Sequence, residues 1–148
     1  MAAGAAGVQQ ILTSTGYLTL KQIYDTYVFS GAIPKIAYVE PTAFRDVKYM
    51  SVKTIFSYGL RTGIRLKSED DVTAIVCTDG FILDLAEDYP PRPTVKHPSD
   101  AKCLVGPNMD STGKYFVRKI VSREFVIINC YTLPVPNMIA RGGYVIIT

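Results

Sequence analysis

The chain has 148 residues, of which 48% are hydrophobic and 20% are charged, and this composition excludes a disordered or low-complexity protein. A single domain of this length buries about 70% of the surface that its unfolded chain exposes, so it needs no disulfide or metal ion to hold it together. The net charge is +3, and the basic residues form no run beyond Arg118-Lys119. No apolar run approaches the roughly 20 residues of a membrane-spanning helix. We therefore expect neither a nucleic-acid partner nor a membrane-spanning segment.

The first seven residues, MAAGAAG, are almost all small. Residues 1–7 are expected to form an N-terminal arm that can lie in a groove too narrow for side chains. Residues 8–148 are expected to form a single domain. Within it, apolar residues at positions 20, 23, 24 and 27 have the spacing of a short amphipathic helix over Leu20–Tyr27.

The rest of the domain has the pattern of short strands separated by turns. Glu69–Asp71 and Asp79–Gly80 are typical of hairpin turns, and Gly59–Gly63 is predicted to be a bend. The proline-rich segment Tyr89–Pro98 is predicted to be extended and irregular. Strands are predicted over Val8–Thr13, Tyr17–Leu20, Lys35–Val39, Val47–Tyr58, Ile64–Ser68, Val72–Thr78, Phe81–Leu85, Lys102–Val105, Tyr115–Val121, Phe125–Leu133 and Tyr144–Thr148. About ten short strands with a single helix indicate an all-β domain.

The cysteine content predicts the redox environment. Cys77, Cys103 and Cys130 are odd in number and have apolar neighbours. We therefore predict buried free thiols in a reducing compartment, and not a disulfide framework. The N-terminus also lacks the basic and apolar regions of a signal peptide. Intracellular synthesis without secretion is expected.

His97 is the only histidine, which excludes a metal site made of several histidines. With Cys103, Cys77 and Cys130 it could bind zinc only if the fold gathered all four. His97 and Cys103 could also act as a Cys–His nucleophile pair, but no third residue is marked out to orient them. We favour an exposed loop histidine beside Pro98 and three separate core thiols. We predict no cofactor, no metal and no small-molecule substrate.

Five segments follow one another in a recognisable order. They are Ile11–Ile23, Val52–Leu83, Asp100–Gly106, Val117–Val121 and Val126–Thr148. This order resembles the sequence blocks of the Hint family, which comprises inteins and hedgehog autoprocessing domains. The resemblance extends over nearly the whole chain and implies an all-β horseshoe of short antiparallel strands with one short helix.

The same resemblance identifies the positions where splicing chemistry takes place in that family. The nucleophilic Cys or Ser position falls near Gly4, the Thr-x-x-His motif falls on Thr78 and Phe81, and the penultimate His and terminal Asn positions fall on Ile147 and Thr148. A glycine, a phenyl ring and a butyl side chain can neither attack a carbonyl nor transfer a proton. The resemblance therefore implies vestigial splicing positions, no catalytic residue and no enzymatic activity.

Two functions are open at this point. The favoured one is a non-catalytic structural or interaction protein with a degenerate intein-like fold. It would be a subunit of a larger assembly such as a phage or virus particle, in a decoration, cement or connector role. The mean hydropathy of +0.16 and the many tyrosines favour protein partners, including a second copy of the chain. The alternative is a self-processing intein or Hint domain with substituted residues, which we expect less because the chain starts at Met1 and stops at Thr148 without flanking segments.

Overall fold

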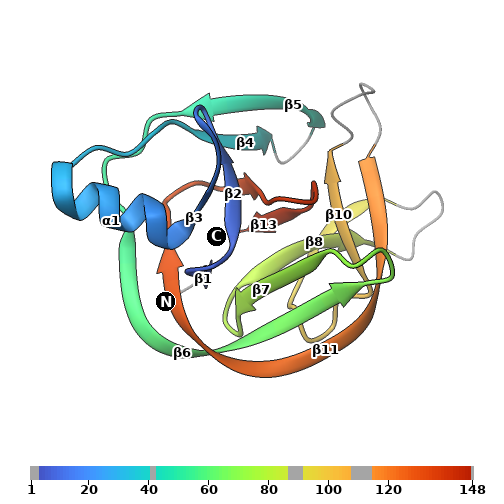
Figure 1. Ribbon diagram of the computed structural model, residues 1–148. Coiled ribbons are helices and arrows are strands. Elements are labelled where there is room, and N and C mark those ends of the chain that lie inside the picture. Colours follow the sequence, from blue (N-terminus) through green and yellow to red (C-terminus); the bar gives the residue numbers. More distant parts are fainter. Residues whose placement is uncertain (1–3, 41–42, 87–91, 108–114, 148) are drawn as a thin grey trace.

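The computed structural model describes residues 4–40, 43–86, 92–107 and 115–147. These residues form an all-β structure with one helix, which confirms the predicted fold class (Figure 1). The strands are β1 (Ala5–Ala6), β2 (Gln10–Thr13), β3 (Gly16–Thr19), β4 (Ile36–Glu40), β5 (Ala43–Met50), β6 (Phe56–Ser68), β7 (Thr73–Cys77), β8 (Phe81–Leu85), β9 (Pro93–Lys96), β10 (Cys103–Pro107), β11 (Tyr115–Thr132), β12 (Asn137–Ile139) and β13 (Val145–Ile147), and the helix is α1 (Leu20–Ser30). Within the described ranges, no helix is long and apolar enough to cross a membrane.

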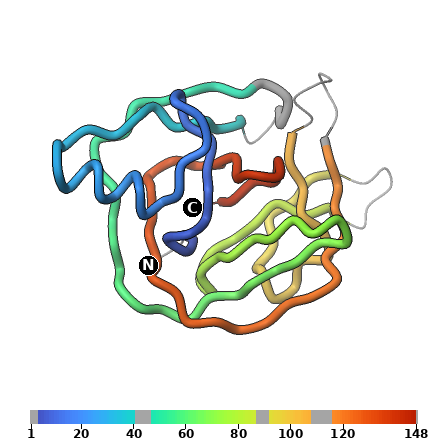
Figure 2. The backbone as a smooth tube through the Cα atoms, viewed as in Figure 1, coloured from blue at the N-terminus to red at the C-terminus, as the bar shows by residue number. Residues whose placement is uncertain are grey.

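The strands form two antiparallel sheets. The first has the order β1-β7-β6-β11-β10, and β1 also pairs with β11, so that β1, β7, β6 and β11 close into a strand ring. The second has the order β3-β2-β4-β12-β13-β8-β9, with β5 paired to β4. The backbone trace shows β6 and β11 curving together around the lower side of the molecule (Figure 2).

β6 and β11 form one long ribbon, although the sequence predicted interruptions in both. The strands are not interrupted at Gly59–Gly63, where a bend between strands was predicted, nor between Val121 and Phe125, where a break was predicted. Gly59 has a φ of 73° and lies opposite Cys130, next to a register shift, so the ribbon bends there without ending. The polar residues 122–124 are exposed, while their backbone continues to pair with β6.

Helix α1 confirms the predicted helix and adds a further turn to it. The Thr19 side chain accepts a hydrogen bond from the Gln22 amide, and the Gln22 side chain accepts one from the Thr19 amide. This capping box fixes the start of the helix. Gly31, with a φ of 73°, ends it in the left-handed conformation. Leu20 and Ile23 are its buried side chains, and they attach α1 to the core.

Several other segments differ from the sequence-based prediction, among them β1 and β12, where no strand was predicted. Residues 51–55 form no strand, although alternation predicted one throughout Val47–Tyr58. In the proline-rich segment, Pro93–Lys96 forms β9 and pairs with β8, while residues 87–91 lie outside the described part. Proline is tolerated in β9 because this strand is at the edge of its sheet, where an amide donor is not required.

Apolar side chains are buried in one main cluster and two smaller ones. The main cluster takes residues from both sheets and from α1. Leu20, Ile64, Leu104 and Tyr144 are among its fully buried members. The smallest cluster contains Ala6, Cys77, Ile128 and Cys130, all from strands of the strand ring. The core therefore holds together the strands that surround the N-terminal segment.

Candidate functional site

The N-terminal segment closes the strand ring. Ala5 pairs with both β7 and β11, and Ala6 lies opposite Cys130. The Cys77 amide donates a hydrogen bond to the Gly4 carbonyl oxygen, with an N–O distance of 2.9 Å. Ala5 and Ala6 are only 0% and 3% exposed. The described part of the segment predicted as an arm, residues 4–7, is therefore a buried part of the same domain.

Gly4 lies where no side chain fits. A Cβ atom built on Gly4 would lie 2.2 Å from the Tyr131 carbonyl oxygen and 2.4 Å from the Thr132 hydroxyl oxygen. Both distances are below the 3.0 Å that real Cβ atoms respect. A serine or cysteine at this position would have to push the backbone of β11 away. The first of the predicted splicing positions thus lacks both a nucleophile and the space for one.

Cys77 and Cys130 form a disulfide beside β1. Their Cα atoms are 6.6 Å apart, within the usual range for a disulfide. The prediction of three free thiols was therefore wrong for these two residues, whereas Cys103 is free and half-buried. The pairing arises because β1 binds both β7 and β11 and brings the two strands together. Neither Cys77 nor Cys130 is therefore a free thiol.

The turn after β7 packs directly against Gly4. The Thr78 hydroxyl donates to the Thr62 carbonyl oxygen at 3.2 Å. The Gly80 amide donates to the Cys77 carbonyl oxygen at 3.0 Å and closes the turn. A Cβ atom built on Gly80 would lie 3.4 Å from the Gly4 carbonyl oxygen. Thr78 and Gly4 are thus brought to neighbouring places although they are far apart in the sequence.

Phe81 and Ile147 lie opposite each other on β8 and β13. Phe81 is 41% exposed and Ile147 is half-buried. Thr148, the last of the predicted splicing positions, lies outside the described residues. Since Phe81 directly follows Gly80, the structure gathers Gly4, Thr78, Phe81 and Ile147 around one turn.

His97, predicted to be an exposed loop residue, instead lies half-buried against the same turn. Its Nε2 atom is hydrogen-bonded to the Thr78 carbonyl oxygen, and its ring meets the Phe81 ring edge-on, with centroids 6.4 Å apart. The Ser99 amide donates to Nδ1 at 3.1 Å. Nδ1 is therefore an acceptor, and the proton of the neutral imidazole is on Nε2. No sequence pattern marked this contact, because it joins residues 19 positions apart across a proline-rich segment.

Cys103 belongs to a different group of residues at the start of β10. Its amide donates to Oδ1 of the buried Asp84 at 3.1 Å, and the Lys102 amide donates to Oδ2 at 3.1 Å. Lys96 Nζ lies 3.5 Å from the same Oδ2 atom. Burial, together with the Asp84 carboxylate, raises the pKa of the Cys103 thiol. In the part of the chain that the structure describes, no three His, Cys, Asp or Glu side chains are grouped so that they could hold a metal ion.

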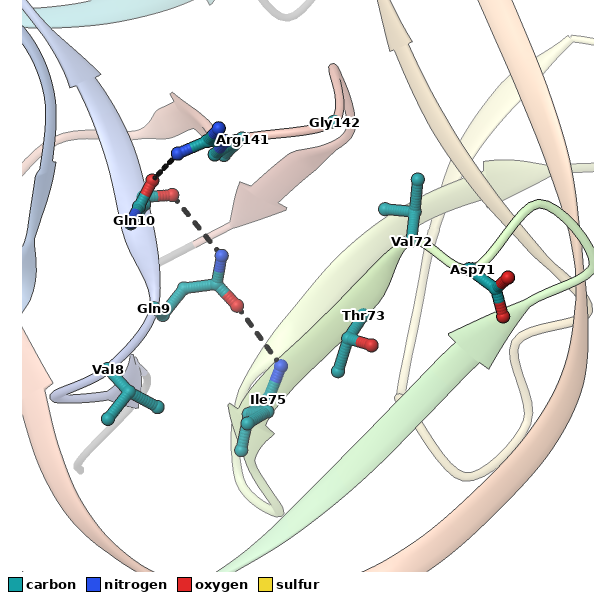
Figure 3. A pocket seen from close by; sticks show the side chains of 9 residues that line it. All are labelled: Val8, Gln9, Gln10, Asp71, Val72, Thr73, Ile75, Arg141 and Gly142. Atoms are coloured by element: carbon teal, nitrogen blue, oxygen red, sulfur yellow. Dashed lines mark hydrogen bonds between the residues drawn. The ribbon is translucent and has the colours of Figure 1, made fainter.

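A pocket of about 430 Å³ lies along the other half of β7, apart from the Gly80 turn (Figure 3). The Gln9 side chain lines this pocket and forms two hydrogen bonds there. Its Oε1 atom accepts from the Ile75 amide at 3.1 Å, and its Nε2 atom donates to the Gln10 carbonyl oxygen at 3.2 Å. Arg141 donates from Nη1 to Oε1 of Gln10 at 2.8 Å. These bonds tie the start of β2 to β7 and to the turn between β12 and β13.

The sequence matches no protein-family model and no curated protein. The structure, in contrast, is similar to those of solved inteins. The TvoVMA intein superposes with a TM-score of 0.78 at 14% identity, over 98% of this chain and 97% of that one. The transcription factor IIB Mvu mini-intein gives 0.77 at 14% identity, over 97% and 99%. A DnaB intein from Synechocystis gives 0.73 at 14% identity, over 98% of each chain. The chain therefore has the Hint fold, as the sequence resemblance predicted.

Proposed function

We propose that this Hint-fold chain is a non-catalytic structural or interaction subunit of a larger protein assembly. The observation that carries the proposal is the packing at Gly4, where a Cβ atom would lie 2.2 Å from the Tyr131 carbonyl oxygen. Splicing and related self-cleavage begin with attack by a serine or cysteine side chain. Position 4 has room for neither, so the first step has no nucleophile there.

The residues around Gly4 support the same conclusion. Phe81 and Ile147 face each other at the neighbouring turn, and neither can donate or accept a proton. Cys77 and Cys130 are joined to each other, so neither supplies a thiolate. Because these groups are missing, we assign the fold a structural role, in which it packs against other proteins.

The exposed surface and the disulfide support a role in an assembly. Phe29, Leu60 and Phe125 are 93%, 70% and 72% exposed, and large apolar side chains of this kind become buried on association. A disulfide is compatible with a particle that leaves the reducing interior of the cell. Synthesis inside a cell, followed by incorporation into a phage or virus particle as a decoration, cement or connector protein, accounts for both features.

A fusion of the chain between two reporter proteins tests the absence of catalysis. We expect the fusion to stay intact during prolonged incubation with and without added thiol, while an active mini-intein in the same fusion is the positive control. Ligated reporters or cleaved fragments would overturn the proposal. Crosslinking and native mass measurements on the isolated protein test the assembly role, which is contradicted by a stable monomer that binds no particle subunit.

A self-processing Hint domain with substituted residues is the second candidate. One observation favours it: the His97 imidazole donates to the Thr78 carbonyl oxygen at the turn that packs on Gly4. Imidazole is the usual acid–base group in proteins near neutral pH. Cleavage of the fusion that is lost in His97→Ala and kept in the control Cys103→Ser would select this candidate.

A further inference from the structure

One stretch of β11 has an unpaired edge. β6 pairs with β11 along one edge, from Ile120 to Thr132. On the opposite edge, β10 pairs with residues 115–119 and β1 pairs with Cys130 and Tyr131. On this edge the Ile120 amide also donates to the Lys102 carbonyl oxygen, and the Asn129 carbonyl oxygen accepts from the Gly7 amide. Between these contacts, no strand among the described residues pairs with residues 121–128. The gap is long enough for an added strand.

The direction of the free backbone groups follows from a single hydrogen bond. The Asn129 carbonyl oxygen accepts from the Gly7 amide at 3.0 Å, so Asn129 directs its backbone groups away from β6. Alternate residues of a strand point the same way, and no register shift lies between Ser122 and Cys130. Arg123, Phe125 and Ile127 therefore direct their amide and carbonyl groups out of the free edge.

The side chains next to this edge are apolar and exposed. Phe125 and Ile127 are 72% and 68% exposed, and both lie on the same face of β11 because they are two positions apart. Leu60 of β6, which is 70% exposed, lies opposite Asn129 and thus on that face as well. An exposed apolar edge of this kind is a template for strand addition.

We propose that a second copy of the chain adds its own β11 antiparallel to this edge. Phe125 is the middle one of the three outward-directed residues Arg123, Phe125 and Ile127, so a two-fold axis at Phe125 uses all three in both copies. Phe125 then faces the partner's Phe125, and Ile127 faces the partner's Arg123. Each facing pair exchanges both of its backbone hydrogen bonds. Aromatic pairs and apolar contacts with the stem of an arginine are favourable between neighbouring strands.

The charges of the free stretch favour a second copy as the partner. Residues 121–128 contain one cationic and one anionic side chain, so the stretch is neutral. Arg123 donates to the Ala101 carbonyl oxygen at 2.8 Å, and Glu124 pairs with Arg65. Two copies can therefore meet here without bringing unpaired like charges together. The inference rests on the proposed assembly function, since it names the first contact of that assembly.

The oligomeric state tests this inference with two variants of the edge. Ile127→Pro removes one outward amide and leaves the ladder with β6 intact, and Phe125→Lys places two ammonium groups at the two-fold axis. Sedimentation equilibrium from low-micromolar to near-millimolar concentration should show a dimer for the wild type. Each variant should weaken the dimer by at least about tenfold in Kd. Phe29→Lys, which removes an exposed ring from α1, is the control and should dimerise as the wild type does.

Hydrogen exchange identifies the strand involved, and circular dichroism checks that each variant is folded. We expect the amides of residues 123, 125 and 127 to gain protection as the wild-type concentration rises. A wild-type monomer at all concentrations overturns the inference, as does a dimer that persists in both folded edge variants. The reporter-fusion experiment measures splicing and not association. A result against the dimer can therefore be distinguished from a result against the non-catalytic function.

Discussion

Cys77 of β7 and Cys130 of β11 are joined by a disulfide although 53 positions separate them in the sequence. A crosslink that closes a loop of this length is expected to stabilise the fold by about 4 kcal/mol, because it restricts the unfolded chain. We expect Cys130→Ser to lose that amount of unfolding free energy in urea titrations. Added reductant should lower the stability of the wild type equally. Cys103→Ser is the matched control, and an equal loss in this control would contradict the prediction.

Gly4→Ala should destabilise the protein because its Cβ atom would lie 2.2 Å from the Tyr131 carbonyl oxygen. Forcing extra atoms into such a packed place costs about 2 kcal/mol or more. Gly16→Ala is the comparison: Gly16 has a positive φ of 104° but open space around it, so the strain there is confined to the backbone. Thermal unfolding of both variants gives the measurement. The steric argument fails if Gly4→Ala is as stable as the wild type.

The neutral imidazole of His97 should carry its proton on Nε2. The Ser99 amide donates to Nδ1, and the Thr78 carbonyl oxygen can only accept. Long-range ¹H–¹⁵N spectra of the imidazole report the tautomer directly. His97→Ala should lose about 1 kcal/mol of stability for the lost hydrogen bonds. A neutral imidazole with its proton on Nδ1 would show that His97 does not make these contacts.

Asp70 should contribute to loss of stability in acid. The Ser68 hydroxyl, and then the Arg118 guanidinium, hold the pKa of this carboxyl below its usual value. A carboxyl whose pKa is lowered by folding stabilises the native state above its unfolded pKa of about 3.9, and the contribution is lost as the pH falls through the folded value. Asp70→Asn should therefore flatten the dependence of stability on pH below about 4. Asp100→Asn serves as control, and an unchanged acid profile in Asp70→Asn would refute the assignment.

Cys103 should react slowly with alkylating reagents. Burial raises the pKa of its thiol, so little thiolate is present at neutral pH. The rate of labelling by iodoacetamide should keep rising above pH 9, beyond the range in which an ordinary cysteine, with a pKa of about 8.5, reaches its plateau. In the folded, unreduced protein, mass spectrometry should find the label on Cys103 alone. Labelling of Cys77 or Cys130 without reductant would contradict the disulfide.

Local sequence patterns predicted most of the fold. The spacing of apolar residues around Leu20 and Ile23 gave the helix, and alternation with hairpin turns gave the all-β class. The order of sequence blocks also predicted the Hint fold that the solved inteins share. These features were predictable because they depend on periodicity and turn residues, which act within a few positions of the chain. The prediction at Gly59 failed because glycine is a local signal for a turn. In the structure, pairing between β6 and β11 continues through Gly59, so the strand does not end there.

By itself, the sequence determined the fold class, the helix and the residue types at Gly4, Thr78, Phe81 and Ile147. Only the tertiary structure decided that Gly4 has no space for a side chain, that Cys77 pairs with Cys130, and that His97 lies against the turn at Thr78. Each of these facts is a contact between segments that are far apart in the sequence. Such contacts leave no local pattern because they depend on distances in space and not on spacing along the chain.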